Sequence, residues 1–235
     1  MPYNNAPRYQ EAIKVENTRK VLGSLATNDG IANFSMIEKE TGLRGGLLQH
    51  HLDRLISLGI VESEVKGTYR LKYKTPLCYV LGSKRTKYVY VGLLGRRDSY
   101  DEPEPKAALS LLSQQKILPS LAYVLTSPEA LGDWKDLKLE YQWILCYGDQ
   151  IFDIDQIQRK LAPQLTDLLR NYSVIIDCTS STKPATIACY DLAQRFLVPC
   201  IYVSEEKKVI KWLISKESIK VRMGLQKAET SRKED

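Results

Sequence analysis

Two short segments of the sequence combine residue types that bind phosphate. The segment 177–184 (DCTSSTKP) places four hydroxyl side chains and a lysine directly before a helical pattern, with a proline suited to the first helical turn. The start of a helix presents free backbone N–H groups and a partial positive charge, so an anion is stabilised there. The segment 92–97 (GLLGRR) adds glycines, which let a ligand approach the backbone, and two guanidinium groups that match phosphate oxygens. Together they predict a site for a phosphate-bearing ligand at Gly92, Leu93, Leu94, Gly95, Arg96, Arg97, Thr179, Ser180, Ser181, Thr182 and Lys183.

A second set of polar and basic side chains lies nearer the amino terminus. Between residues 44 and 54 they fall on the polar side of a helical pattern, and between residues 66 and 72 they lie on and after a turn. A helix in the major groove reads base edges, while basic side chains beside it neutralise phosphates. We expect base contacts from Arg44, Gln49, His50 and Arg54, and backbone contacts from Lys66, Arg70 and Lys72.

Other chemistries lack their sequence patterns. No complete G-x-G-x-x-G follows an expected strand, which counts against a dinucleotide cofactor, and the P-loop pattern G-x-x-x-x-G-K-[ST] is absent. The five cysteines are scattered through apolar runs without a C-x-x-C pair, and the two histidines are neighbours in the chain. We therefore expect buried core thiols, no metal site and no resident cofactor.

The elements that carry the second set of residues follow a definite order. Apolar spacing predicts a helix over 17–27 and a second over 36–41, with Ser35 as its N-cap and Glu38 completing a capping box. A third helix is expected from Arg44 or Gly45 to Gly59, with an apolar stripe of Leu48, Leu52, Leu55 and Ile56.

After Gly59 the apolar period changes to two, which predicts a β-hairpin over 60–73 with Lys66 and Gly67 at its turn. The order is that of a winged helix-turn-helix, and the stretch 46–62 (GLLQHHLDRLISLGIVE) resembles the recognition helix and wing of ArsR-like or MarR-like regulators. The resemblance covers residues 14–75 and implies binding to double-stranded DNA. The alternative is a module for dimerisation or protein binding, with a solvated charged face. The spacing from Arg44 to His50 or His51 also fits the loose pattern of HEPN ribonucleases, but the helix-turn-helix already accounts for these residues.

The carboxy-terminal part alternates strand and helix patterns. Strands are expected at 87–94, 120–126, 140–147, 173–178 and 198–203, with helices at 155–171 and 183–196. This alternation predicts a Rossmann-like parallel α/β sheet, in which ligands bind beyond the carboxyl ends of the strands. We expect a DNA-binding domain over 1–80, a ligand-sensing domain over 81–220 and a tail over 221–235. The alternation after Lys216 suggests a further strand to Val221, and the termini, including Met1 to Gln10, are expected to be disordered.

The segment Asp-x-Thr-x-x-Thr-Lys-Pro, between a strand and a helix rich in small residues, resembles the second ligand motif of CARF domains, the CRISPR-associated Rossmann fold. The resemblance spans residues 86–214. It departs from the family at Ser180 and Ser181, where glycines are usual, and in domain order, because the best-known CARF regulators place the winged helix last. The resemblance implies a homodimer that binds cyclic oligoadenylate, taken here as cyclic tetra-adenylate, in type III CRISPR antiviral immunity. Thr179, Ser181, Thr182 and Lys183 would then contact the ligand, with residues 92–97 as the opposite wall.

These features predict a cyclic-oligoadenylate-responsive transcriptional regulator. The alternatives are a metal-independent ring nuclease, in which Lys183, Ser181 and Thr182 would act on the ligand, and a winged-helix module that binds another protein. A net charge of +6 permits nucleic-acid binding, and each half of the chain carries a similar share of it. No apolar run is long enough for a membrane helix and the first residues do not form a signal peptide, so we expect a cytoplasmic protein with no membrane partner.

Overall fold

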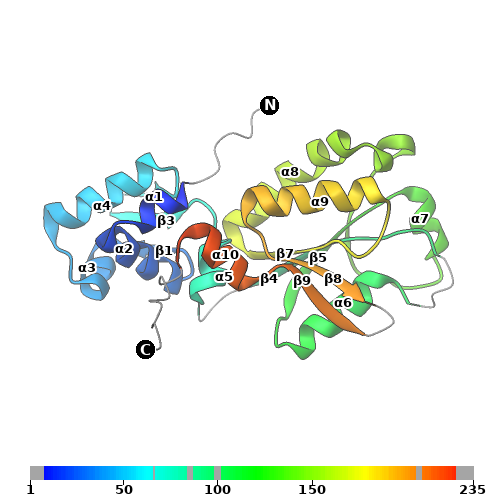
Figure 1. Ribbon diagram of the computed structural model, residues 1–235, viewed down its shortest axis with the longest axis horizontal. Helices are drawn as coiled ribbons and strands as arrows, with labels where there is room; N and C mark the ends of the chain where they lie inside the picture. The colour runs from blue at the N-terminus through cyan, green and yellow to red at the C-terminus, as the bar shows by residue number, and fades with distance from the viewer. Residues whose placement is uncertain (1–7, 66, 84–86, 98–101, 205–207, 226–235) are drawn as a thin grey trace, which may run out of the picture.

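The computed structural model describes residues 8–65, 67–83, 87–97, 102–204 and 208–225. Figure 1 shows an elongated molecule, with a three-stranded sheet and its helices at one end and a six-stranded sheet between helices at the other. The first and last described helices lie nearer the smaller sheet, and the carboxyl ends of the parallel strands point away from it.

The smaller sheet is antiparallel, with β3 paired to both β1 and β2. Its elements are α1 (Tyr9–Ile13), α2 (Glu16–Thr27), β1 (Ile31–Asn33), α3 (Phe34–Thr41), α4 (Gly45–Ser57), β2 (Val61–Ser63), β3 (Thr68–Leu71) and α5 (Leu77–Leu81). The three helices and the hairpin expected over 17–73 are therefore present. Leu48, Leu52 and Leu55 of α4 are buried, as the apolar spacing predicted.

Two details of this region differ from the sequence prediction. The N-cap of α3 is Asn33 rather than Ser35: its Oδ1 accepts the Met36 N–H at 2.8 Å, because the strand β1 runs directly into the helix. Glu38 forms no capping box with Ser35, and its Oε1 accepts the Gly45 N–H at 2.8 Å. Ile56, predicted in the buried stripe of α4, is exposed, because it lies on the solvent side of that helix.

The larger sheet has the strand order β6-β5-β4-β7-β8-β9, in which all neighbours are parallel except β8 and β9. This confirms the mixed α/β, Rossmann-like class. Its elements are β4 (Tyr88–Leu93), α6 (Glu104–Gln114), β5 (Pro119–Thr126), α7 (Pro128–Asp133), β6 (Gln142–Leu145), the 3-10 helix η1 (Gly148–Phe152), α8 (Ile154–Asn171), β7 (Ser173–Asp177), α9 (Lys183–Phe196), β8 (Cys200–Ser204), β9 (Val209–Ile214) and α10 (Lys216–Met223).

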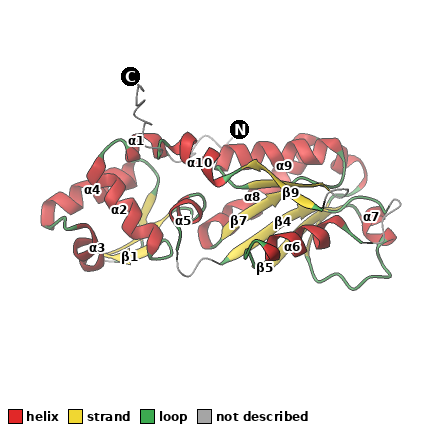
Figure 2. Ribbon diagram, turned by 60° about the horizontal axis from the view of Figure 1, so that its bottom comes forward, coloured by secondary structure: helices red, strands yellow, loops and turns green. Residues whose placement is uncertain are grey.

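Helices cover both faces of this sheet, as Figure 2 shows. Successive strand residues alternate between the faces, so Val89 and Val91 pack in one buried cluster with α8 and α9, while Tyr90 packs in another with α6. Strands buried on both faces read as continuous apolar runs, which is why they were visible in the sequence. All five cysteines are free and buried, which confirms the prediction of core thiols.

Both described ends of the chain differ from expectation. Residues 216–223 form the helix α10, not a strand, because the Ser215 hydroxyl caps its first turn and Ile219 and Met223, four residues apart, are buried on one face. At the other end Tyr9 and Gln10 lie in α1, and Tyr9 is buried. The antiparallel strand β9 was not anticipated either.

The two sheets are joined by polar and apolar contacts. Arg170 of α8 forms an ion pair with Glu62 of β2, with Nη2 2.7 Å from Oε2. The Lys74 N–H donates to the Leu169 carbonyl at 2.7 Å, and one continuous cluster of buried apolar residues extends through both regions. None of the described helices has the length and apolar character that crossing a bilayer requires.

Candidate functional site

The two predicted phosphate-binding segments meet at the centre of the larger sheet. One follows β4 and the other follows β7, and these strands are parallel neighbours at the point where the strand order reverses. The Gly95 N–H donates to the Ser180 Oγ at 2.8 Å, so the two segments are hydrogen-bonded to each other. In open α/β sheets the crevice at this switch point is where ligands bind.

The glycines of the first segment have separate steric roles. A Cβ on Gly95 would lie 3.1 Å from both the Ser180 Oγ and the Ser181 N, so the absence of a side chain permits the contact between the segments. A Cβ on Gly92 would lie 2.3 Å from the Tyr90 hydroxyl, so this glycine makes room for a buried ring. Gly92, Leu93 and Leu94 are all buried and contribute to the core rather than to an open surface.

A buried carboxylate supports the second segment from below. The Asp177 Oδ2 accepts the Tyr90 hydroxyl at 2.7 Å, and its Oδ1 accepts the Thr179 N–H at 2.9 Å together with the Thr179 hydroxyl. Burial raises the pKa of Asp177 to about 6, although the hydrogen bonds from Thr179 and Tyr90 oppose that rise. Asp177 thus fixes the loop to β4.

Three of the four hydroxyl groups in this segment are already engaged within the protein. Thr179 Oγ1 also accepts the Val203 N–H at 2.8 Å, and Ser180 Oγ holds Gly95. The Thr182 Oγ1 donates to the Ile151 carbonyl of η1 at 2.5 Å and accepts the Ala185 N–H at 3.3 Å, which makes it the N-cap of α9. These hydrogen bonds hold the loop in its observed shape.

Ser181 has a left-handed backbone, with φ of +76°. A Cβ disfavours this conformation, so Ser181→Gly should increase the free energy of unfolding by about 0.5–1 kcal/mol, after allowing for the greater freedom of glycine in the unfolded chain. Ser180→Gly should instead decrease it by about 1 kcal/mol, because the Gly95 N–H loses its acceptor. Urea titrations of both variants compare the two positions directly. Equal effects at the two positions would contradict this account.

Lys183 is the first residue of α9 and its side chain is exposed. Within the described ranges no ion pair or hydrogen bond of its ammonium group is found. It therefore presents a positive charge at a helix start whose backbone already favours anions.

Arg96 and Arg97 form ion pairs with two acidic residues, one at the end of α7 and one just beyond it, which the sequence analysis did not single out. Arg96 Nε lies 2.5 Å from the Asp133 Oδ2, and Arg97 Nη1 lies 2.8 Å from the Asp136 Oδ2. The hydrogen bond from Arg96 is the main cause that holds the pKa of Asp133 below its usual value. Both guanidinium groups thus bind carboxylates in this structure.

Trp134 explains why Arg97 takes this direction. The Arg97 guanidinium carbon lies 4.9 Å from the centroid of the Trp134 ring, and the indole N–H donates to the Gly95 carbonyl at 3.1 Å. Stacking of this kind stabilises an arginine beside a neighbouring acid. The signal in the sequence was the acidic pattern of residues 133–136, which lies far from the arginines along the chain.

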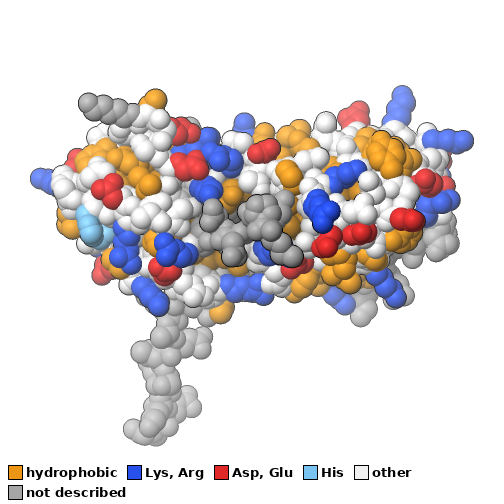
Figure 3. Space-filling model, turned by 90° about the horizontal axis from the view of Figure 1, so that it is seen from above, with side chains coloured by type: hydrophobic (Ala, Val, Ile, Leu, Met, Phe, Trp, Pro, Cys, Tyr) orange, Lys and Arg blue, Asp and Glu red, His pale blue; other side chains and the backbone are white. Residues whose placement is uncertain are grey.

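The candidate DNA-contacting residues lie mainly on α4. Arg44, His50 and Arg54 are exposed, and Figure 3 shows histidine and basic side chains close together at this end of the molecule. Gln49 is engaged internally, since its Nε2 donates to Asp53 Oδ1 at 2.8 Å and its Oε1 accepts the Tyr69 hydroxyl at 3.2 Å.

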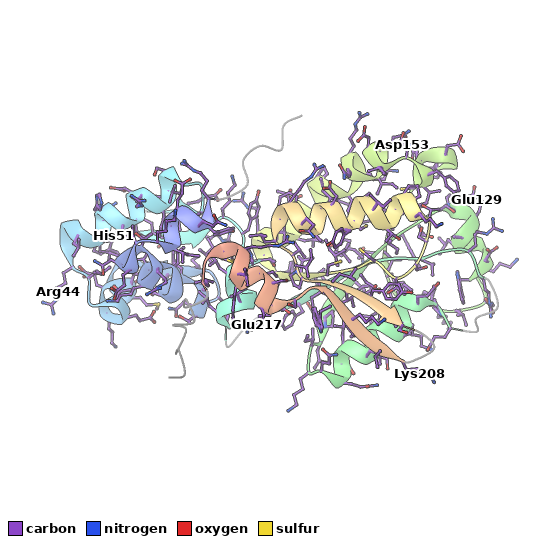
Figure 4. All side chains as sticks on the ribbon, viewed as in Figure 1. Arg44, His51, Glu129, Asp153, Lys208 and Glu217 are labelled. Carbon is purple, nitrogen blue, oxygen red and sulfur yellow. The ribbon has the colours of Figure 1, made fainter. Side chains whose placement is uncertain are left out.

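The hairpin residues have individual environments. Arg70 Nη1 pairs with the Glu64 Oε1 at 2.8 Å, and the Lys72 ammonium lies 5.7 Å from the Tyr73 ring centroid. Lys66 lies outside the described residues. His51, the neighbour of His50, is buried with Nδ1 3.0 Å from the Thr18 Oγ1, and burial is the main cause that lowers its pKa. The His51 side chain is thus part of the core; Figure 4 shows its position and that of Arg44 at the start of α4.

The fold and the site define a Rossmann-like α/β protein with a candidate anion site at its topological switch point. No protein-family model matches the sequence, and no curated protein is similar to it. Solved structures with partial likeness include Can2 from Sulfobacillus thermosulfidooxidans in complex with cyclic tetra-adenylate, at 17% identity over 55% of this chain and 35% of that one, with a TM-score of 0.40.

A second is protein VC1899 from Vibrio cholerae, at 8% identity over 55% of this chain and 34% of that one, with a TM-score of 0.42. A third is Enterococcus italicus Csm6 bound to cyclic hexa-2'-fluoro-hexa-dAMP, at 14% identity over 60% of this chain and 39% of that one, with a TM-score of 0.39. The chain spans between a third and two fifths of the length of these proteins.

Proposed function

We propose that the protein is a ligand-responsive regulator that binds cyclic oligoadenylate at the larger sheet and double-stranded DNA through the smaller one. Binding of the ligand at the larger sheet is supported by the hydrogen bond between Gly95 and Ser180. This bond joins the two separately predicted phosphate-binding segments at the switch point. The choice of ligand rests on the resemblance of the segment from Asp177 to Pro184 to the CARF motif. Cyclic tetra-adenylate is the probe to use first.

The DNA half of the proposal rests on the arrangement of α2, α3 and α4 followed by the β2–β3 hairpin. This order and the three-stranded antiparallel sheet are those of a winged helix-turn-helix, with α4 in the place of the recognition helix. Two small exposed residues, Gly45 and Gly46, begin α4, so its amino-terminal turn can approach DNA closely. In this view residues 1–80 form the DNA-binding domain.

The proposal includes a homodimer. Lys183, Ile187 and Tyr190 recur at helical spacing along one side of α9, and Ile187 is 53% and Tyr190 37% exposed. Apolar side chains exposed in this way are suited to contact a second copy. Pairing of two α9 helices about a two-fold axis would bring both Lys183 ammonium groups to one anionic ring.

A physical route connects the site to the smaller sheet. Helix α9 begins at the candidate site and runs along the sheet toward the first domain, as Figure 1 shows. At its far end the Phe196 ring lies 6.1 Å from the Tyr73 ring, and Gln194 accepts a hydrogen bond from Arg222 of α10. The Arg222 carbonyl in turn accepts the Gln10 side-chain N–H at 2.7 Å. If α9 can take two arrangements, a ligand that binds one of them more tightly shifts the protein toward it and can thereby change its affinity for DNA. The size of this change is limited by the difference between the ligand's affinities for the two arrangements.

Binding to promoter DNA should weaken steeply with salt. Replacement of Lys66, Arg70 and Lys72 together by alanine should weaken binding to all sequences and reduce the salt slope by about 3, because each phosphate contact releases about one counterion. Arg54→Ala should instead cost roughly 1–3 kcal/mol on the cognate site alone. Gel-shift titrations over a salt series measure both effects.

The matched control removes three exposed lysines, Lys135 and Lys138 between α7 and β6 and Lys211 on β9, and so lowers net charge equally. It should leave the salt slope nearly unchanged. If no promoter-proximal fragment binds at low salt, the regulator proposal fails and a protein-binding module becomes the better description. Calorimetry with cyclic tetra-adenylate should show one ring per two chains, and slow conversion of that ring to linear fragments would favour the ring nuclease.

A further inference from the structure

Two exposed aromatic side chains lie beside the candidate site and have no role in the function proposed so far. Tyr147, at the start of η1, is 59% exposed, and Phe152, at its end, is 62% exposed. Large rings are costly to leave in water, and most aromatic side chains of the larger sheet pack in its core. Figure 3 shows hydrophobic side chains gathered toward this end of the α8 and α9 face.

The loop that carries these rings is tied to the phosphate-binding segment. The Ile151 carbonyl accepts the Thr182 hydroxyl at 2.5 Å. Phe152 follows Ile151 in the chain, and Lys183 follows Thr182. The Cα atom of each is therefore about 3.8 Å from that of a residue in this hydrogen-bonded pair. Phe152 and Lys183 are therefore each next in the chain to the hydrogen bond that joins the two loops, even though the strands β6 and β7 that precede them are not neighbours in the sheet.

The start of η1 is held in a defined conformation. The Tyr147 N–H donates to the Gln150 Oε1 at 3.0 Å, and the Lys160 ammonium of α8 lies 3.2 Å from the same oxygen. Lys160 also donates to the Leu145 carbonyl at the end of β6 and lies 5.4 Å from the centroid of the Tyr147 ring. The ring is thus positioned by a cation while more than half of its side chain remains open to solvent.

Exposed rings set beside cationic groups are the arrangement with which proteins hold single-stranded nucleotides: bases stack on the rings and phosphates meet the charges. We propose that Tyr147 and Phe152 form a base-stacking platform for the adenines of the ligand whose phosphates face Lys183. The inference rests on the proposed function and assigns to it the residues that bind the bases.

The platform differs from the apolar side of α9 proposed for the dimer. Ile187 and Tyr190 follow Lys183 along the same side of α9, and Ile187 is one turn from it. Tyr147, in contrast, has the Lys160 ammonium next to its ring. Cation and ring together suit a polyanion with flat bases better than an apolar helix of a second copy. A second copy as the occupant of the platform is nevertheless an outcome that the experiment distinguishes.

The test uses the full chain with Tyr147→Leu and Phe152→Leu, and the ring-conserving controls Tyr147→Phe and Phe152→Tyr. Calorimetry with cyclic tetra-adenylate should show a loss of affinity of about 10-fold or more for each leucine variant and wild-type affinity for each control. A ring carrying one fluorescent adenine analogue, whose emission stacking quenches, should be quenched by the unmodified protein and by the controls, and much less by the leucine variants.

Each other outcome has a definite meaning. If the unmodified protein binds the ring and the leucine variants bind and quench equally well, the platform is wrong and the proposed function stands. If sedimentation equilibrium shows that a leucine variant has a smaller assembly than its control, the rings belong to an interface between copies and the platform is again wrong. If the unmodified protein binds no cyclic oligoadenylate, the proposed function fails, and the platform with it.

Discussion

Replacement of Lys183 by alanine should weaken the binding of cyclic tetra-adenylate by at least about 100-fold, while the fold persists. A charge-assisted hydrogen bond to phosphate is typically worth about 1.5–3 kcal/mol, and a two-fold site loses it twice. The ammonium is exposed at the first residue of α9, so its removal leaves no buried group without a partner. Calorimetry gives the affinity, and thermal unfolding without ligand should give the same Tm as the unmodified protein.

Two further variants make this result specific. Lys183→Arg keeps the charge at the start of the helix and should retain most of the affinity. Lys211→Ala removes an exposed lysine from β9, elsewhere on the same sheet, and should bind as the unmodified protein does. Equal affinity of Lys183→Ala and the unmodified protein would show that the ligand binds elsewhere, whereas equal losses in Lys183→Ala and Lys211→Ala, with Lys183→Arg unchanged, would point to net charge alone.

Asp177→Asn should change how stability depends on pH. Because burial raises the pKa of Asp177 to about 6, the folded protein binds a proton more tightly than the unfolded chain does. The stability contributed by the protonated carboxyl is fully present below the unfolded pKa near 4 and is lost as pH rises through about 6. Relative to the unmodified protein, the asparagine variant should therefore gain about 2–3 kcal/mol of unfolding free energy between about pH 4 and pH 8.

The chemistry of the site allows this substitution. The asparagine oxygen can accept the Thr179 N–H, and its amide can donate to the Tyr90 hydroxyl, which rotates to accept. Urea unfolding at several pH values measures the difference, with Asp167→Asn, an exposed aspartate of α8, as the control that should show little change. A pH profile for Asp177→Asn parallel to that of the unmodified protein would contradict the raised pKa.

If the platform and the lysine both bind the ligand, the site recognises two chemical features of one molecule from separate loops. Lys183 lies on the loop after β7, and the rings lie on η1 after β6. The hydrogen bond from Thr182 to Ile151 keeps the two loops in register. In that case Thr182 would also act as a positioning residue, because its hydroxyl joins the two loops.

The sequence by itself predicted the main helices and parallel strands and the two segments of the candidate site. Helical spacing predicted α2 and α4, the change to a period of two predicted the β2–β3 hairpin, and continuous apolar runs predicted the parallel strands. The position of the two phosphate-binding segments followed from one rule, that loops after parallel strands meet at the carboxyl edge. Such features are local, because backbone periodicity and turn chemistry are set by neighbours in the chain.

The tertiary structure alone decided which side chains are available to a ligand. The sequence offered no reason to distinguish the hydroxyl groups of Thr179, Ser180 and Thr182 from that of Ser181. In the structure Thr179 is hydrogen-bonded to β8, Ser180 to the segment after β4, and Thr182 to η1. The same holds for Arg96 and Arg97, whose acidic partners are distant in the chain, at the end of α7 and just beyond it.

Helix α10 was missed for the same reason. Ile219, Val221 and Met223 alternate with polar residues as they would in a strand, and packing against α1 and α5 stabilises the helix instead. The free energy of such contacts depends on the distances between helices that are far apart in the chain, and the order of residues does not fix these distances. Only the folded structure could therefore show which side chains of the candidate site are already engaged within the protein.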